Sequence, residues 1–199
     1  MPWATPILDQ ATGITHVEHG GHPLITIAPL RTQLLQAEII NGATDPIQGW
    51  VSFFSGEKVA APVLVYRKET QVPTCFITVL YPHPANSGAE LHVTNLTVTL
   101  NDGRLADETE ISGLIIETAE HVDTCIVAHN GTLPWKAFID YESDGDLVHV
   151  RRKKSDGAIV QVIMKGGHKL LFQGQPVLKG HDSRKSIIFD GEITAWEKR

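Results

Sequence analysis

The chain consists largely of short runs of apolar and β-branched residues, each closed by a turn sequence. Val63–Tyr66 and Phe76–Leu80 are such runs, and Leu91–Leu100 alternates further before it ends at Asn101-Asp102-Gly103. β-Branched side chains fit a pleated sheet, and Asp-Gly favours a tight turn between two strands. The pattern therefore predicts a chain made mainly of β-strands.

Two further segments are predicted to be hairpins, because each joins two apolar runs through an Asp-Gly turn. In the first, residues 147–152 and 158–164 flank the turn Lys153–Gly157. In the second, residues 186–189 and 192–196 flank Asp190-Gly191. Strands separated by such short connections favour antiparallel pairing.

Only the segment Pro29–Ile40 permits a helical interpretation, through Leu30, Leu34, Leu35 and Ile39. A proline begins this segment and a glycine follows it, so a loop and a strand would fit it equally well. Taken together, the patterns predict an all-β fold: an antiparallel β-sandwich with little or no helix.

A chain of 199 residues can bury one sizeable core. We therefore expect a single β-sandwich domain over residues 1–199, with the order of about the first 20 residues left open. No apolar run approaches the ~20 residues that cross a bilayer, and no signal peptide is visible. No membrane partner is expected, and the compartment is left open.

The net charge of −6 argues against nucleic acid as a partner, because phosphate-binding surfaces are usually basic. One concentrated run of cations stands apart, Arg151-Arg152-Lys153-Lys154, at the tip of the first predicted hairpin. Arg151 and Arg152 could each bind a uronate or sulfate group through two hydrogen bonds. The alternative, favoured by the turn residues Ser155-Asp156-Gly157, is a solvated turn that keeps an edge hairpin soluble.

Residues 16–22, with the sequence His-Val-Glu-His-Gly-Gly-His, are the obvious candidate for a metal site. His16, His19 and His22 carry imidazoles of the kind that bind zinc. On a strand, however, His16 and Glu18 share one face and His19 points to the other, and the HExxH spacing is missing. We expect a surface histidine cluster, with no metal and no other cofactor.

Among the tryptophans, Trp135 is the candidate for stacking on a sugar ring, because it follows Pro134 in a loop. Trp50 adjoins Phe53 and Phe54, and we expect it to pack in a core.

Catalytic groups are harder to assemble from this sequence. A glycan lyase needs a base such as Tyr or His to remove a proton. His129-Asn130 is one adjacent pair with suitable chemistry, and three tyrosines lie in predicted strands: Tyr66, Tyr81 and Tyr141. No spacing ties these residues together. Cys75 and Cys125 both lie in apolar runs, where two buried thiols and a cross-strand disulfide are the alternatives.

Three successive segments carry a family pattern. Gly49–Ser52 reads GWVS, Pro62–Tyr66 reads PVLVY, and Thr78–Pro82 reads TVLYP. In this order and spacing they resemble the closing β-sandwich region of the heparinase II/III-like polysaccharide lyases. The resemblance covers Ile25–Pro82 and continues more loosely to the C-terminus.

The resemblance implies an architecture and a parent enzyme. Members of this family carry an N-terminal α/α-toroid followed by β-sandwich layers, and they cleave uronate-containing polysaccharides, such as heparan sulfate or alginate, by β-elimination. Their catalytic residues and their metal ligands lie upstream of the region that matches. No catalytic or metal-binding residue is therefore carried over to this chain.

Three interpretations follow. In the first, the chain is the C-terminal β-sandwich domain of such a lyase, inactive alone and packed on an upstream α/α-toroid of the same polypeptide. Separated from the toroid, it should expose an apolar docking patch, through which it could form a homodimer. In the second, it is a free-standing module that binds acidic polysaccharide through Trp135 or residues 151–154. In the third, it is a small enzyme that uses His129 or the N-terminal histidines.

Overall fold

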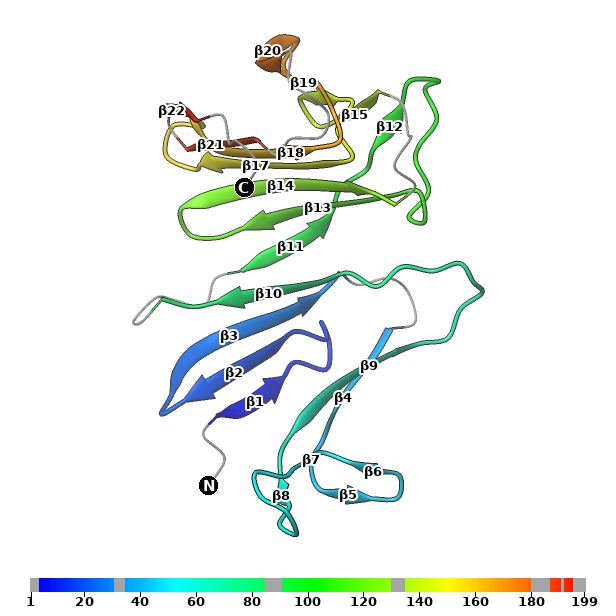
Figure 1. The fold of residues 1–199 in the computed structure, drawn as a ribbon, viewed down its shortest axis with the longest axis vertical. Helices are drawn as coiled ribbons and strands as arrows, with labels where there is room; N and C mark the ends of the chain where they lie inside the picture. Colours follow the sequence, from blue (N-terminus) through cyan, green and yellow to red (C-terminus); the bar gives the residue numbers. More distant parts are fainter. Residues whose placement is uncertain are drawn as a thin grey trace. The chain divides into compact units, whose positions relative to one another are not determined.

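The computed structural model describes residues 4–30, 35–84, 91–129, 135–179, 187–190 and 192–194. Within these ranges the chain forms strands and turns without a helix, which confirms the predicted all-β fold. No helix in the described part is therefore long and apolar enough to cross a membrane. The chain divides into two compact units (Figure 1).

Unit 1 comprises Met1–Val72 and Phe76–Ala89. Its main element is an antiparallel sheet of four strands in the order β1-β2-β3-β10 (Figure 1). The strands are β1 (Thr5–Leu8), β2 (Thr15–His19), β3 (His22–Pro29) and β10 (Thr78–Pro82). Because β1 and β2 pair from Leu8 with Thr15 to Thr5 with Glu18, this stretch of the N-terminal segment belongs to the sheet.

The rest of unit 1 consists of three two-stranded ribbons. These are β4 (Leu35–Ile40) with β9 (Val63–Lys68), β5 (Ala43–Thr44) with β6 (Ile47–Gln48), and β7 (Trp50–Val51) with β8 (Val59–Ala60). The helical interpretation is therefore wrong for Leu35–Ile40, which is a strand. Residues 31–34 of that segment lie outside the described part of the chain.

Trp50 and its phenylalanine neighbours have different environments. The indole Nε1 of Trp50 donates to the carbonyl oxygen of Ala43 at 2.7 Å, and the Lys58 ammonium lies 4.7 Å from the ring centroid. Phe53 and Phe54, in contrast, are 71% and 73% exposed. Trp50 is thus partly buried and bonded to β5 of the neighbouring ribbon, whereas the two phenylalanines face solvent.

Unit 2 comprises Pro73–Cys75 and Glu90–Arg199 and contains two antiparallel sheets (Figure 1). The larger, seven-stranded sheet has β11 (His92–Asn95), β13 (Ile111–Glu117), β14 (His121–Ala128), β17 (Leu147–Lys153), β18 (Ile159–Lys165), β21 (Ile187–Asp190) and β22 (Glu192–Thr194), paired in that order. The smaller, five-stranded sheet has β12 (Thr99–Leu100), β15 (Lys136–Phe138), β16 (Tyr141–Ser143), β19 (Lys169–Phe172) and β20 (Gln175–Lys179). Both predicted hairpins are confirmed, as β17–β18 and β21–β22.

Alternation along the strands builds one core between the two sheets of unit 2. On β17, Val148 and Val150 have no exposed surface, whereas the intervening His149 points to the other face. The core side chains come from both sheets: Val98, Leu100, Ile111, Ile126, Phe138, Tyr141, Val148, Val150, Val162, Met164, Leu170 and Leu178. Burial of each aliphatic side chain contributes about 1.5–3 kcal/mol, so this layer is the main source of stability in unit 2.

The single strand predicted over Leu91–Leu100 is divided between the two sheets. Its first half is β11 and its end is β12, and the chain crosses from one sheet to the other at Leu96. There the Leu96 amide donates to the Gly113 carbonyl at 3.0 Å. A Cβ at Gly113 would lie 2.5 Å from the Leu96 carbonyl oxygen, so this crossing requires glycine.

One charged residue lies inside unit 2. Lys136 is fully buried next to Phe138 on the inward face of β15. Burial lowers the pKa of Lys136, and the attraction of Asp146 and Asp144 opposes that effect. A buried cation is tolerated where carboxylates compensate its charge.

Replacing Lys136 should therefore destabilise the fold. We expect Lys136→Ala to lower the free energy of unfolding by about 3 kcal/mol, because it leaves a cavity and removes the charge that compensates Asp144 and Asp146. Urea denaturation measures this loss. The exposed Lys165 provides the matched control, and Lys165→Ala should change stability by less than about 0.5 kcal/mol. Equal effects of the two substitutions would contradict a structural role for Lys136.

Candidate anion-binding site

Two turns come together at one end of the seven-stranded sheet. In the antiparallel pairing of β14 with β17, His121 lies opposite Lys153. Beyond this pair, the Lys154 amide donates to the Glu120 carbonyl at 2.8 Å, which ties the β17–β18 turn to the β13–β14 turn. The Lys154 ammonium also lies 3.1 Å from a carboxylate oxygen of Glu117.

An open pocket of about 570 Å³ lies between these turns, lined by Ala119, Glu120, His121, Lys153, Lys154 and Ser155. Its charged groups are two lysines and one carboxylate, with an imidazole and a hydroxyl beside them. Lysine ammonium, imidazole N–H and hydroxyl groups all donate hydrogen bonds to carboxylate or sulfate oxygens. The pocket is thus suited to a small anionic group rather than to an apolar ligand.

Arg151 was predicted to bind substrate, and the structure places it in an internal ion pair. Its Nε and Nη2 donate to the two carboxylate oxygens of Asp123 at 2.7 and 2.9 Å. His149 Nε2 lies 3.1 Å from Oδ1 of the same carboxylate. Asp123 is only 4% exposed, so its charge depends on these partners.

The environment of Asp123 has opposing effects on its pKa. Burial raises it, but hydrogen bonds from His149 and Arg151 and the Arg151 charge outweigh burial and lower the pKa to about 2. Cys125 occupies the next position on the same face of β14. Burial, followed by the charge of Asp123, raises the pKa of the Cys125 thiol to about 12.

Arg152 points to the opposite face of β17 from Arg151, because neighbouring strand residues alternate. Its guanidinium carbon lies 5.4 Å from the centroid of the Phe172 ring, and Phe172 contacts the buried Tyr141. The four cations of residues 151–154 therefore do not form one patch. Among them, Lys153 and Lys154 line the pocket.

Trp135, the predicted sugar-stacking residue, is partly buried beside the five-stranded sheet. Its Nε1 donates to Oε2 of Glu142 at 2.8 Å, and the Lys169 ammonium lies 5.3 Å from the ring centroid. One face of the ring is thus associated with a cation that belongs to the protein itself. Within the described part of the chain, Trp135 groups with Glu142 and Lys169 rather than with the pocket.

The N-terminal histidines separate into two places. His16 Nδ1 lies 2.9 Å from the hydroxyl of Thr26, and that hydroxyl lies 2.7 Å from His83 Nε2. His19 and His22 face each other across the turn between β2 and β3. Among the described residues, no three His, Cys, Asp or Glu side chains converge as metal ligands.

Each candidate base has its own local partners. Tyr141 is buried in the core, and Tyr66 donates to the Gly13 carbonyl at 2.8 Å; burial raises the pKa of both phenols. Tyr81 lies edge-on to His83 in unit 1. His129 Nε2 is 2.7 Å from the Ser112 hydroxyl, whereas Asn130 lies outside the described residues.

Sequence reasoning missed Glu120 and His121 as pocket residues. They lie about 30 positions before Lys153 in the chain, and only the pairing of β14 with β17 brings them alongside it. The sequence predicted the turn at Lys153–Gly157 but did not indicate which other strand would lie beside β17.

No protein-family model matches the chain, and the search of curated proteins finds no match.

The Asp123 ion pair predicts a defined pH dependence of stability. The folded-state pKa lies below the ordinary value of 3.8, so the charged carboxylate stabilises the fold above about pH 4. That contribution, about 2 kcal/mol, is lost as the pH falls toward 2. We expect Asp123→Asn to lower the free energy of unfolding at neutral pH. The variant should also lose less stability than the original chain as the pH falls from about 4 to 2.

Urea denaturation at several pH values between 2 and 7 measures this effect. Asp140→Asn, at an exposed position, is the control and should lose as much stability over this acid range as the original chain. An Asp123→Asn variant with an unchanged loss over the same range would contradict the assigned ion pair.

Proposed function

We propose that this chain is the C-terminal β-structured part of a heparinase II/III-like polysaccharide lyase, that it is not catalytic by itself, and that it holds acidic glycan at the basic pocket. The observation that carries the proposal is the position of Lys153, Lys154 and His121 around one open pocket. A uronate-containing polysaccharide presents a carboxylate on each uronate, and a sulfated one adds further anions. Both are groups that ammonium and imidazole donors bind.

The pocket is open, and a single sugar would bind it weakly. A charge-assisted hydrogen bond contributes about 1.5–3 kcal/mol, and the Glu117 partner of Lys154 competes with the ligand. A polymer compensates for weak single contacts, because successive uronates raise the effective concentration at the site. The expected ligand is therefore a polysaccharide rather than a monosaccharide, and its affinity should fall as salt rises.

The second part of the proposal is an apolar contact with the α/α-toroid. Among the described residues of unit 1, seven large apolar side chains are more than half exposed, and four of them come from residues 47–59: Ile47, Phe53, Phe54 and Val59. This segment lies within the stretch that resembles the lyases. Exposed apolar surface of this kind is typical of a face that another domain covers. These residues support the expectation of a docking patch.

A free-standing carbohydrate-binding module is the alternative, and the same pocket favours it. Both functions predict glycan binding by this chain alone. The two functions make different predictions for unit 1, because a free-standing module does not need an apolar docking surface at Phe53 and Phe54. Association with a separately expressed toroid domain of a heparinase-like lyase, lost in a Phe53→Ser/Phe54→Ser variant, would support the lyase domain over the module.

The pocket is tested by replacing its lysines. We expect Lys153→Gln/Lys154→Gln to weaken binding to polyuronate or heparin by about tenfold or more, because it removes two ionic contacts of about 0.7 kcal/mol or more each. Affinity electrophoresis in gels that contain each polysaccharide measures the change. Lys68→Gln/Lys165→Gln removes two cations elsewhere and should bind within about twofold of the original chain. Equal retardation of both double variants would refute the pocket.

The lack of catalysis is tested separately. β-Elimination creates an unsaturated uronate that absorbs in the ultraviolet, so a spectrophotometer follows it directly. We expect no absorbance to develop when the chain alone is incubated with polyuronate or heparan sulfate. Steady formation of the unsaturated product, abolished by His129→Asn, would instead support the interpretation of the chain as a small enzyme.

A further inference from the structure

A second polar cluster in unit 2 lies outside the basic pocket and consists of Cys75, Ser112 and His129. The Ser112 hydroxyl is 2.7 Å from His129 Nε2 and 3.5 Å from the Cys75 sulfur. The sulfur itself is 3.9 Å from His129 Nε2. A thiol, a hydroxyl and an imidazole thus form one connected group, from three segments that are distant in sequence.

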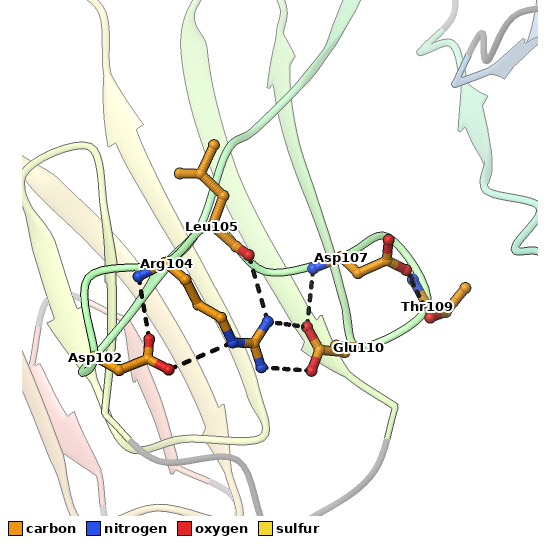
Figure 2. A network of polar contacts seen from close by, with 6 residues as sticks. All are labelled: Asp102, Arg104, Leu105, Asp107, Thr109 and Glu110. Carbon is orange, nitrogen blue, oxygen red and sulfur yellow. Dashed lines mark hydrogen bonds and ion pairs between the residues drawn. The ribbon is translucent and has the colours of Figure 1, made fainter.

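The backbone that carries this cluster is well anchored. Ser112 lies near the start of β13 and His129 directly follows β14, and the two strands pair along their length. The His129 amide donates to the Glu110 carbonyl at 2.9 Å. Figure 2 shows how the Glu110 side chain is fixed in turn: its two oxygens accept from Nη1 and Nη2 of Arg104 at 2.6 and 2.7 Å.

The same loop is closed by two aspartates (Figure 2). The Asp102 carboxylate accepts from the Arg104 amide at 3.1 Å, and the Asp107 carboxylate accepts from the Thr109 amide at 2.8 Å. The Glu110 carboxylate also accepts from the Asp107 amide at 3.0 Å. The loop before β13 is therefore held rigidly, and with it the backbone of Ser112 and its contact to His129.

The distances define a route for a proton. The direct sulfur-to-imidazole distance is near the limit for a hydrogen bond, whereas the path through the Ser112 hydroxyl has two shorter steps. The Cys75 S–H can donate to the Ser112 oxygen while the Ser112 O–H donates to His129 Nε2. Ser112 is 6% exposed, so it is suited to relaying a proton rather than to meeting a reagent. Cys75 is partly exposed and His129 is exposed, so a small reagent can reach the sulfur.

The other cysteine provides the contrast within the same unit. Cys125 lies on β14 opposite His149, and burial raises the pKa of its thiol to about 12. A thiolate is the species that reacts, so Cys125 is expected to be inert in the folded chain. The two thiols thus have different neighbours: Cys75 is near Ser112 and His129, whereas Cys125 is near Asp123 and His149.

We propose that Cys75 is a thiol-exchange site that forms a mixed disulfide with small disulfides, with Ser112 and His129 accepting its proton. In this step the Cys75 thiol transfers its proton through Ser112 to His129, and its sulfur attacks one sulfur of the disulfide. The S–S bond of the reagent breaks as the new S–S bond forms. The departing thiolate recovers the proton from His129 and leaves as a thiol, so one disulfide is consumed and one is made.

The test uses the full chain and glutathione disulfide at neutral pH. Intact mass and peptide mapping follow the gain of one glutathionyl group at each cysteine. We expect Cys75 to react while Cys125 stays unmodified. His129→Asn and Ser112→Ala should each slow the reaction of Cys75 by at least about fivefold, because either change interrupts the proton route. His92→Gln replaces an exposed histidine of β11 and should leave the rate unchanged.

Cys125 also reports on folding, since it becomes reactive only if the sheet opens. If Cys125 reacts in the His129→Asn or the Ser112→Ala variant, that variant is excluded as unfolded. The rate of Cys75 in the remaining variant then tests the proposal. If both variants unfold, the original chain is compared with a synthetic peptide of residues 72–79, and slower reaction of Cys75 than of the peptide overturns the proposal. Equal Cys75 rates in the original chain and in a folded His129→Asn variant overturn it as well.

Discussion

The two sheets of unit 2 are held together by apolar side chains that alternate with polar ones along each strand. On β17 and β18, Val148, Val150 and Val162 face the smaller sheet and have no exposed surface. This contact fixes the order of strands β13, β14, β17 and β18, and Asp123, His149 and Arg151 lie on the opposite face of the larger sheet. The pocket, the Asp123 ion pair and the Cys75 cluster all depend on that order, because their members come from neighbouring strands or turns.

The same alternation decides what each cation of the basic run can do. Arg151 and Arg152 are adjacent in sequence, yet one pairs with Asp123 and the other lies over Phe172. Both guanidiniums are already engaged with groups of the protein, and displacing them would uncover a buried carboxylate or an aromatic ring. Lys153 is the last paired residue of β17 and Lys154 follows it, where the chain turns and long side chains reach solvent. The glycan proposal therefore rests on the lysines.

The two polar sites of unit 2 differ in the chemistry that they offer. The basic pocket has ammonium groups at an open surface, which is suitable for a polymer that binds through repeated ionic contacts. The Cys75 cluster has three connected polar groups next to a loop that Arg104 and Glu110 fix, which is suitable for one defined proton transfer. Neither site requires the other. A lyase domain that binds glycan through its lysines could carry a thiol-exchange site without conflict between the two.

The sequence by itself determined the class of fold, because strand periodicity and Asp-Gly turns are local properties that survive in any arrangement of the strands. It predicted the β17–β18 hairpin and identified the basic run. It did not reveal that the run 91–100 crosses between sheets, since that crossing depends on the close approach of Leu96 to Gly113. Nor did it indicate that His121 lies beside Lys153, or that Cys75 reaches His129. Those pairings join residues that are distant along the chain, and only the burial of a shared core brings such residues together.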